Sequence, residues 1–329
     1  MSDDRYPWLR RRRPGPGVDW EFFTYWTLVA IFVGLGILVL QVHLAVYGPN
    51  APGLFSDAAL YFEATRVWLA GGDPWTVQLL NSPRFAAPPP VLLLNVPLLP
   101  FGQQAAVAFW VIADIAGWAA IIWRLRLGPW WVLFPPFLEG FFPASPDIAL
   151  AGLVVVSGGA IAAMTKPYSI PSLIADRRWA ALAIAAFAVV VTIPILPWAQ
   201  FFAQLPEIQQ ALADQSRDVS AWGQPVLMVL VVAALISLGP RTALRLVTPT
   251  LWPNAQLHYS VFSARAGAES AALAVALAFP GYTAQLVIVY ATVIGVLRVA
   301  QAMARSRAGS APPSEAGTAD VDGTILRSS

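Results

Sequence analysis

The sequence predicts an all-α integral membrane protein, a bundle of about ten (8–12) transmembrane helices with an amphipathic helix in its first external loop. Of its 329 residues, 57% are hydrophobic and only 12% are charged, whereas soluble domains usually carry about 25% charged residues. The mean hydropathy is +0.62. Long apolar runs alternate with short arginine-containing segments. This amount of polar surface is too small to coat a globule in water. We therefore expect lipid to face much of the apolar surface.

Basic clusters set the expected orientation, because they mark the cytoplasmic ends of membrane helices. Arg10–Arg13 precede the first apolar run, Phe22–Tyr47, which can cross a core of ~30 Å at ~1.5 Å per residue. We therefore predict a basic cytoplasmic N-terminus (1–20), a polytopic membrane domain (21–305) and a disordered cytoplasmic tail (306–329), which is poor in apolar residues. The expected location is the cell membrane, multi-pass, with both termini cytoplasmic.

Two polar segments are expected outside, at 48–87 and 199–220. The first contains Ser56–Ala70, where apolar residues recur at helical spacing, with Ser56 as a possible N-cap. Asp147–Met164 is expected to cross the membrane as one apolar run. Lys166, the only lysine, follows that run in a Lys-Pro pair and is interpreted as a cytoplasmic anchor.

Several kinds of site are excluded or disfavoured. The chain has no cysteine, which removes disulfides, thiolate metal sites and a cysteine nucleophile. It has no phosphate-binding P-loop, no dinucleotide fingerprint and no His-Glu-x-x-His. We predict no cofactor and no metal. Nucleic acid is not an expected partner, since no basic domain accompanies Arg10–Arg13.

The candidate acidic residues lie in the first external loop. Asp57 opens the amphipathic helix just after the first predicted span. It is either a carboxylate stabilised by the helix dipole or a catalytic or binding group. Glu63 and Arg66 are three residues apart and can pair on the helix surface. Asp73 sits in a Gly-Gly-Asp-Pro turn, where a structural role is expected. Arg84, later in the loop, is a candidate for binding an anion.

A second candidate region surrounds His258. Pro249 and Pro253 break the helical pattern, and the backbone groups freed by such a break need burial in protein or a watery cavity. The side chains expected to line this break are Trp252, Asn254, Gln256 and His258. The alternative for His258 is a hydrogen-bonded interfacial histidine with no part in chemistry.

Three motifs occur in a characteristic order. The first is Ser56-Asp-Ala-Ala-Leu-Tyr-Phe-Glu-Ala64, followed by Gly71-Gly-Asp-Pro-Trp75. The second runs from Phe85 through three prolines to Pro100. The third is Thr248-Pro-Thr-Leu-Trp252, followed by His258-Tyr259. Over roughly residues 20–305 the chain resembles the multi-spanning C-type glycosyltransferases, specifically glycosyltransferase family 87, which includes polyprenyl-phosphate-mannose-dependent mannosyltransferases of bacterial envelopes.

That resemblance implies an inverting hexosyltransferase with its site at the outer face of the membrane. It would move a sugar, expected to be mannose, from a polyprenyl-phosphate donor to a lipid or glycan acceptor, with Asp57 as general base. Arg84 and His258 are then the candidates to bind the donor phosphate, and the prenyl chain would lie in a groove open to membrane lipids. The further residues predicted to bind substrate are Tyr61, Glu63, Trp252, Asn254, Gln256 and Tyr259.

Two other classes of function remain open. A transporter or lipid-binding membrane protein would need polar residues near the bilayer midplane, where the sequence offers only Asp114, Glu139 and Asn95. An inactive transferase homologue that acts as a scaffold would keep the motifs without the activity.

Overall fold

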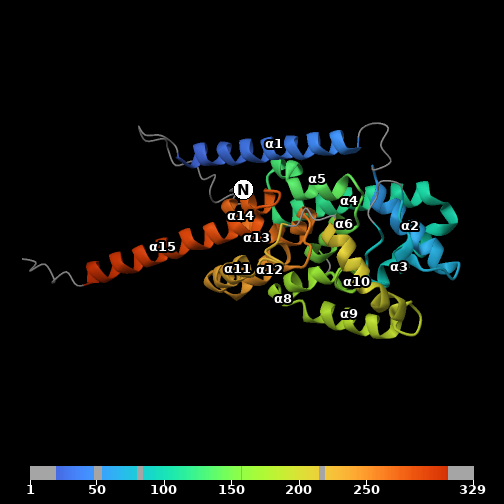
Figure 1. The fold of residues 1–329 in the computed structure, drawn as a ribbon. Coiled ribbons are helices and arrows are strands. Elements are labelled where there is room, and N and C mark those ends of the chain that lie inside the picture. The colour runs from blue at the N-terminus through green and yellow to red at the C-terminus, as the bar shows by residue number, and fades with distance from the viewer. Residues whose placement is uncertain (1–19, 48–53, 80–83, 157, 215–218, 310–329) are drawn as a thin grey trace, which may run out of the picture.

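A computed structural model describes residues 20–47, 54–79, 84–156, 158–214 and 219–309. The predicted cytoplasmic N-terminus lies almost wholly outside these ranges, as does the predicted tail beyond Gly309. Within them the chain forms fifteen α-helices joined by short 3-10 helices and loops (Figure 1). The described residues form no strand, apart from an isolated backbone bridge between Gln78 and Arg84. The predicted all-helical class is confirmed.

The elements that build the site come from the first two thirds of the chain and from one later turn. They are α2 (Ser56–Leu69), α5 (Pro135–Phe141), α6 (Asp147–Val156), α7 (Ala160–Thr165), the 3-10 helix Pro167–Ser169 that leads into α8 (Ile170–Ala175), and the 3-10 helix Leu257–Ser263. Proline begins several of these short helices, a position where its fixed φ and missing N–H cost nothing. The remaining site element is α10 (Trp198–Asp214), which carries Pro206 inside it.

The closest helix pair is α4 (Gln103–Leu125) with α6, which touch along their backbones. A Cβ on Gly117 of α4 would lie 2.5 Å from the Ile148 carbonyl oxygen, and one on Gly152 of α6 would lie 2.5 Å from the Gly117 Cα. Glycine at both positions permits this approach. It fixes the start of α6, which bears Asp147, against α4.

Two long helices lie at the edge of the assembly, α1 (Trp20–Tyr47) and α15 (Thr283–Gly309) (Figure 1). Phe32 of α1 is fully buried against the rings of Trp130, Trp131 and Phe134. The outer half of α15 projects away from the other helices (Figure 1). Residues 306–309 continue this helix, so it extends into the start of the predicted disordered tail.

The other helices complete the bundle and hold a second charged cluster. Arg245, only 1% exposed, pairs with Asp176 at 2.6 Å and Glu269 at 2.6 Å, while Arg265 also reaches Asp176 at 2.7 Å. These contacts tie together the following helices: α9 (Trp179–Thr192) by way of the preceding loop, α12 (Pro240–Leu251) and α13 (Ala264–Glu269). The helices not yet named are α3 (Pro90–Asn95), α11 (Pro225–Leu238) and α14 (Ala271–Ala278).

Two helices in the described residues are long and apolar enough to cross a membrane, Gln103–Leu125 and Thr283–Ser306. Five shorter apolar stretches of 10–17 residues accompany them. Ten full spans are therefore not shown, because these five apolar stretches are shorter than the ~20 residues that a membrane span needs. Several short helices nevertheless expose large apolar side chains, including Phe187 at 70%, Val226 at 76% and Ile236 at 74%.

Candidate functional site

A cavity of about 110 Å³ lies where α2, the start of α6, the loop after α7 and the 3-10 helix Leu257–Ser263 meet. Of the residues predicted as site residues from the sequence, six line it: Asp57, Tyr61, Arg84, Gln256, His258 and Tyr259. The chain also contributes four polar residues that the sequence did not single out for the site: Ser145, Asp147, Lys166 and Tyr168. Segments more than 200 residues apart therefore share one polar cavity.

Helix α2 brings two of these residues to the cavity. Asp57 and Tyr61 are four residues apart and so lie on one face of the helix. The start of α2 is bound to the segment before α6, since the backbone N–H of Asp57 donates to the Pro143 carbonyl at 2.9 Å. Phe55 is the N-cap, with a left-handed φ of 60°, and no side chain caps the helix. The predicted N-cap Ser56 is instead inside the first turn.

Asp147 is the centre of the polar network. Its side chain is fully buried and accepts hydrogen bonds from the Ser145 hydroxyl at 2.6 Å and from the Tyr168 hydroxyl. Lys166 Nζ lies 3.4 Å from Oδ1, and His258 Nε2 lies 3.2 Å from Oδ2. One carboxylate thus orients two cationic side chains that both line the cavity.

Lys166 is 5% exposed, and its ammonium also donates to the Tyr61 hydroxyl at 2.8 Å. This position contradicts the cytoplasmic anchor predicted from the sequence. The cause is the turn between α6 and α7: Gly158 and Gly159 adopt φ of 110° and 69°, conformations open to glycine at little cost. The run 147–164 therefore forms two short helices instead of one long one, and Lys166 returns to the end of the bundle where Asp57 lies.

His258 is held from two sides. Its Nδ1 lies 3.5 Å from Glu139 Oε2, and its backbone N–H donates to the same oxygen at 2.6 Å. Burial disfavours the charged ring, but the hydrogen bonds and charges of Asp147 and Glu139 outweigh it and raise the pKa of His258 to about 10. The side chain is therefore an imidazolium at neutral pH.

Asp57 is bound differently from Asp147: its side chain forms a hydrogen bond with Ser145. In the part of the chain that the structure describes, it forms no ion pair within 4 Å. Burial raises the pKa of Asp57, while the positive charges of His258 and Lys166 act to lower it. A partly buried carboxylate outside any ion pair can accept a proton from a substrate. Protonation of Asp147 would instead disrupt its contacts with Lys166 and His258.

Arg84 lies at the rim of the cavity, with its guanidinium turned toward α10. It pairs with Glu207 at 3.0 Å, donates to Gln204 at 3.3 Å and donates through Nε to the Trp75 carbonyl. Gln204 in turn donates to Asp73 at 2.9 Å, and Asp73 caps the turn at Trp75. Arg84 is therefore already engaged by a carboxylate, unlike a cation left free for a phosphate.

The remaining predicted residues lie at or beyond the edge. Tyr259 stacks on Tyr168 with ring centroids 4.0 Å apart. Trp252 packs edge-on against Tyr168 at 6.0 Å, but it does not line the cavity. Asn254 occupies a turn with φ of 52°. Glu63 pairs with Arg66 at 2.5 Å on the exposed side of α2, outside the cavity.

The comparisons with known proteins were made against protein-family models, curated proteins and solved structures, and none of the three returned a match. The chemistry of the cavity therefore provides the evidence for function. Within the described residues, no group of three or more histidine and acidic side chains is placed to hold a metal ion.

Proposed function

We propose that this chain is a membrane glycosyltransferase that moves a sugar, expected to be mannose, from a polyprenyl phosphate to a lipid or glycan acceptor, with inversion at the anomeric carbon. One observation carries the proposal: a carboxylate that takes no part in the ion pairs of the site, Asp57, shares a small cavity with two buried cations, Lys166 and His258. This arrangement suits a reaction in which a hydroxyl loses a proton and a phosphate departs as an anion.

The carboxylate would act as general base. Asp57 takes the proton of the acceptor hydroxyl while the acceptor oxygen attacks the anomeric carbon from the side opposite the phosphate. The bond from that carbon to the phosphate oxygen breaks, and the phosphate leaves with the electron pair. General-base catalysis of this kind contributes roughly 10²–10⁴-fold to a rate.

The cations would stabilise the leaving group. Charge-assisted donors aimed at the developing phosphate monoester lower the barrier most when they are already oriented. Asp147 provides this orientation for Lys166 and His258. We therefore assign the phosphate to these two side chains, and we place Arg84, which is bound to Glu207, at the entrance.

An apolar groove beside the site suits the prenyl chain. It has a volume of about 460 Å³ and runs between α4 and α6. Four residues that line it, Leu94, Trp110, Ala113 and Ala149, belong to the cluster that packs around Ala58, next to Asp57. The groove thus begins next to the helix that carries the proposed base.

Asp57→Asn tests the proposal. The amide keeps the size of the side chain but cannot take a proton, so transfer should fall by at least ~10²-fold. The measurement is the release of polyprenyl phosphate from polyprenyl-phosphate mannose by the purified full-length protein in lipid, with a membrane lipid and glycan extract as acceptor.

Glu63→Gln is the matched control, a carboxylate on the same helix outside the cavity, and it should stay close to wild type. An Asp57→Asn enzyme that keeps more than about a third of wild-type turnover would remove the assignment of the base. Absence of donor turnover in the wild type with every acceptor fraction would overturn the transferase proposal itself.

A further inference from the structure

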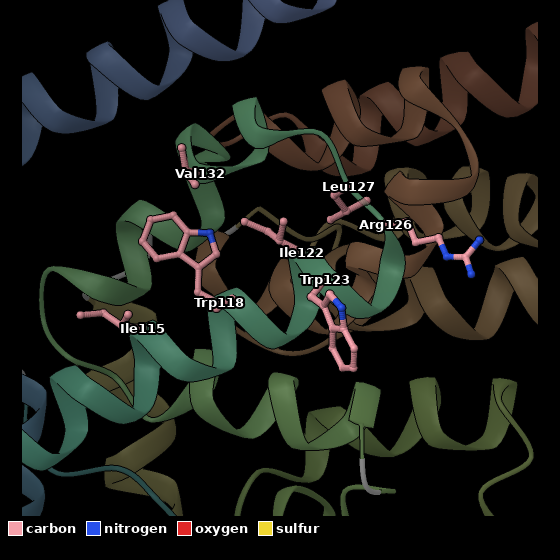
Figure 2. Close-up of a pocket in the computed structure, with 8 residues that line it drawn as sticks. Ile115, Trp118, Ile122, Trp123, Arg126, Leu127 and Val132 are labelled. Carbon is pink, nitrogen blue, oxygen red and sulfur yellow. The ribbon is translucent and has the colours of Figure 1, made fainter. Parts of the chain in front are cut away.

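A second hollow lies along the far half of α4, away from the Asp57 cavity, with which it shares no lining residue. Its volume is about 770 Å³, within the ~300–1,000 Å³ of typical ligand pockets. Figure 2 shows Ile115 and Trp118 at one end of it and the guanidinium of Arg126 at the other, extended away from the apolar side chains.

The apolar wall of this groove faces outward. Ile115 is 50% exposed and Trp123 is 76% exposed, and α4 is one of the two helices long and apolar enough to cross a membrane. Water is a poor solvent for such a surface, whereas lipid chains suit it. The exposed tryptophan near the end of α4 matches the preference of this residue for the membrane interface.

The length of the groove fits one leaflet. Ile115 and Arg126 are eleven positions apart, which corresponds to ~16 Å along a helix at ~1.5 Å per residue. Half of a hydrocarbon core of ~30 Å is ~15 Å. A lipid whose phosphate lies at Arg126 would therefore place its chain ends near Ile115, at the middle of the bilayer.

The charge at the end of the groove selects the kind of lipid. No carboxylate lines the groove, and within the described residues Arg126 forms no ion pair. Arg126 ends α4 in the left-handed conformation, with φ of 54°, and so turns away from the helix axis. A guanidinium binds phosphate oxygens in a bidentate manner, and a net negative headgroup adds a charge attraction that a zwitterionic one lacks.

We propose that this groove binds one anionic phospholipid of the bilayer, with an acyl chain along Ile115, Trp118 and Trp123 and its phosphate at Arg126. The proposal requires α4 to lie in a membrane but does not depend on the transferase activity. Its function is to hold the end of α4 at the level of the headgroups, and α4 in turn supports α6 and Asp147.

The test uses the full-length protein in detergent micelles, titrated with phosphatidylglycerol or phosphatidylcholine brominated on the acyl chains. Bromine quenches nearby tryptophans, and Trp118→Phe identifies the part of the signal that arises in the groove. We expect half-quenching of that part at a lower mole fraction of phosphatidylglycerol than of phosphatidylcholine. Arg126→Gln should raise the phosphatidylglycerol requirement about fivefold, the equivalent of one lost arginine contact.

Two variants make the result specific. Arg124→Gln removes a neighbouring exposed arginine that does not line the groove, and it should leave the requirement unchanged. Ala119→Phe fills the groove from an exposed position and should reduce quenching by both lipids. If Arg124→Gln and Arg126→Gln raised the phosphatidylglycerol requirement equally, the effect would come from general surface charge. That result would overturn the proposed binding site. Displacement of the brominated lipid by polyprenyl phosphate at lower concentrations than by phosphatidylglycerol would assign the groove to the prenyl chain instead.

Discussion

At the scale of single residues, the site depends on one buried carboxylate that serves two cations. Asp147 is fully buried and contacts Lys166 at 3.4 Å and His258 at 3.2 Å, while Glu139 supports His258 from the other side. Removing one member of a buried ion pair is costly because the partner is left as an uncompensated charge. Asp147 is thus a positioning residue, which fixes the proposed phosphate-binding groups without touching the base.

Asp147→Asn should lower the free energy of unfolding by ~3–5 kcal/mol, because Lys166 loses its counter-charge in a buried site. Adding Lys166→Met to this variant should cost much less than Lys166→Met alone, since the charge left unpaired is then gone. Thermal unfolding of the four proteins in detergent measures this coupling. Additive effects within ~0.5 kcal/mol would show that the two side chains do not interact.

At the scale of elements, the hairpin of α6 and α7 explains why some site residues could be predicted from the sequence and others could not. The sequence predicts Asp57, Tyr61 and His258 as site residues because they stand in recognisable motifs. Lys166 was assigned to the opposite end of the bundle, because the apolar run 147–164 has the length of a membrane span. Gly158 and Gly159 inside that run indicate a turn. The high hydropathy of the run, taken alone, predicts one continuous helix instead. With Lys166 predicted at the opposite end, the sequence indicates no cation that could pair with Asp147.

The contact between α4 and α6 gives a prediction at the same scale. In Gly117→Ala the new Cβ would lie 2.5 Å from the Ile148 carbonyl oxygen and 2.6 Å from the Ala149 Cα, and backbone atoms cannot move aside cheaply. We expect a loss of ~1–3 kcal/mol in unfolding free energy, together with reduced transfer, because Asp147 begins α6.

Gly34→Ala is the control for that change, since nothing lies within 4 Å of a Cβ at this position of α1. Alanine in an exposed helix should be neutral or stabilise by ~0.4–1 kcal/mol. The measurement is the midpoint of thermal unfolding, which should be lower for Gly117→Ala than for Gly34→Ala. Similar stability of Gly117→Ala and Gly34→Ala would contradict the close approach of α4 and α6.

At the scale of the whole molecule, composition was sufficient for the helical class but not for the number of crossings. A low charge content predicts that lipid covers much of the surface, yet it does not say whether an apolar run forms one long helix or folds into two short ones. The structure contains both kinds. Residues 103–125 form one helix of span length, whereas 147–156 and 160–165 form two separate short helices. Glycine and proline positions, not average hydropathy, decide between these outcomes.

The orientation of the molecule is the last prediction, and α4 is the element on which to test it. Thr76 is exposed in the 3-10 helix Pro74–Thr76, which packs against α2. Helix α2 also contacts the residues just before Gln103, and Arg124 is exposed near the other end of α4. The chain has no cysteine, so Thr76→Cys and Arg124→Cys each provide a single thiol. Because basic residues are retained in the cytoplasm, an impermeant thiol reagent should label Thr76→Cys in intact cells and Arg124→Cys only after lysis.

Labelling of both in intact cells would mean that α4 does not cross the membrane. The reverse pattern would keep the span but invert the protein, and it would place the Asp57 cavity on the cytoplasmic side, where a donor made for the outer face could not reach it.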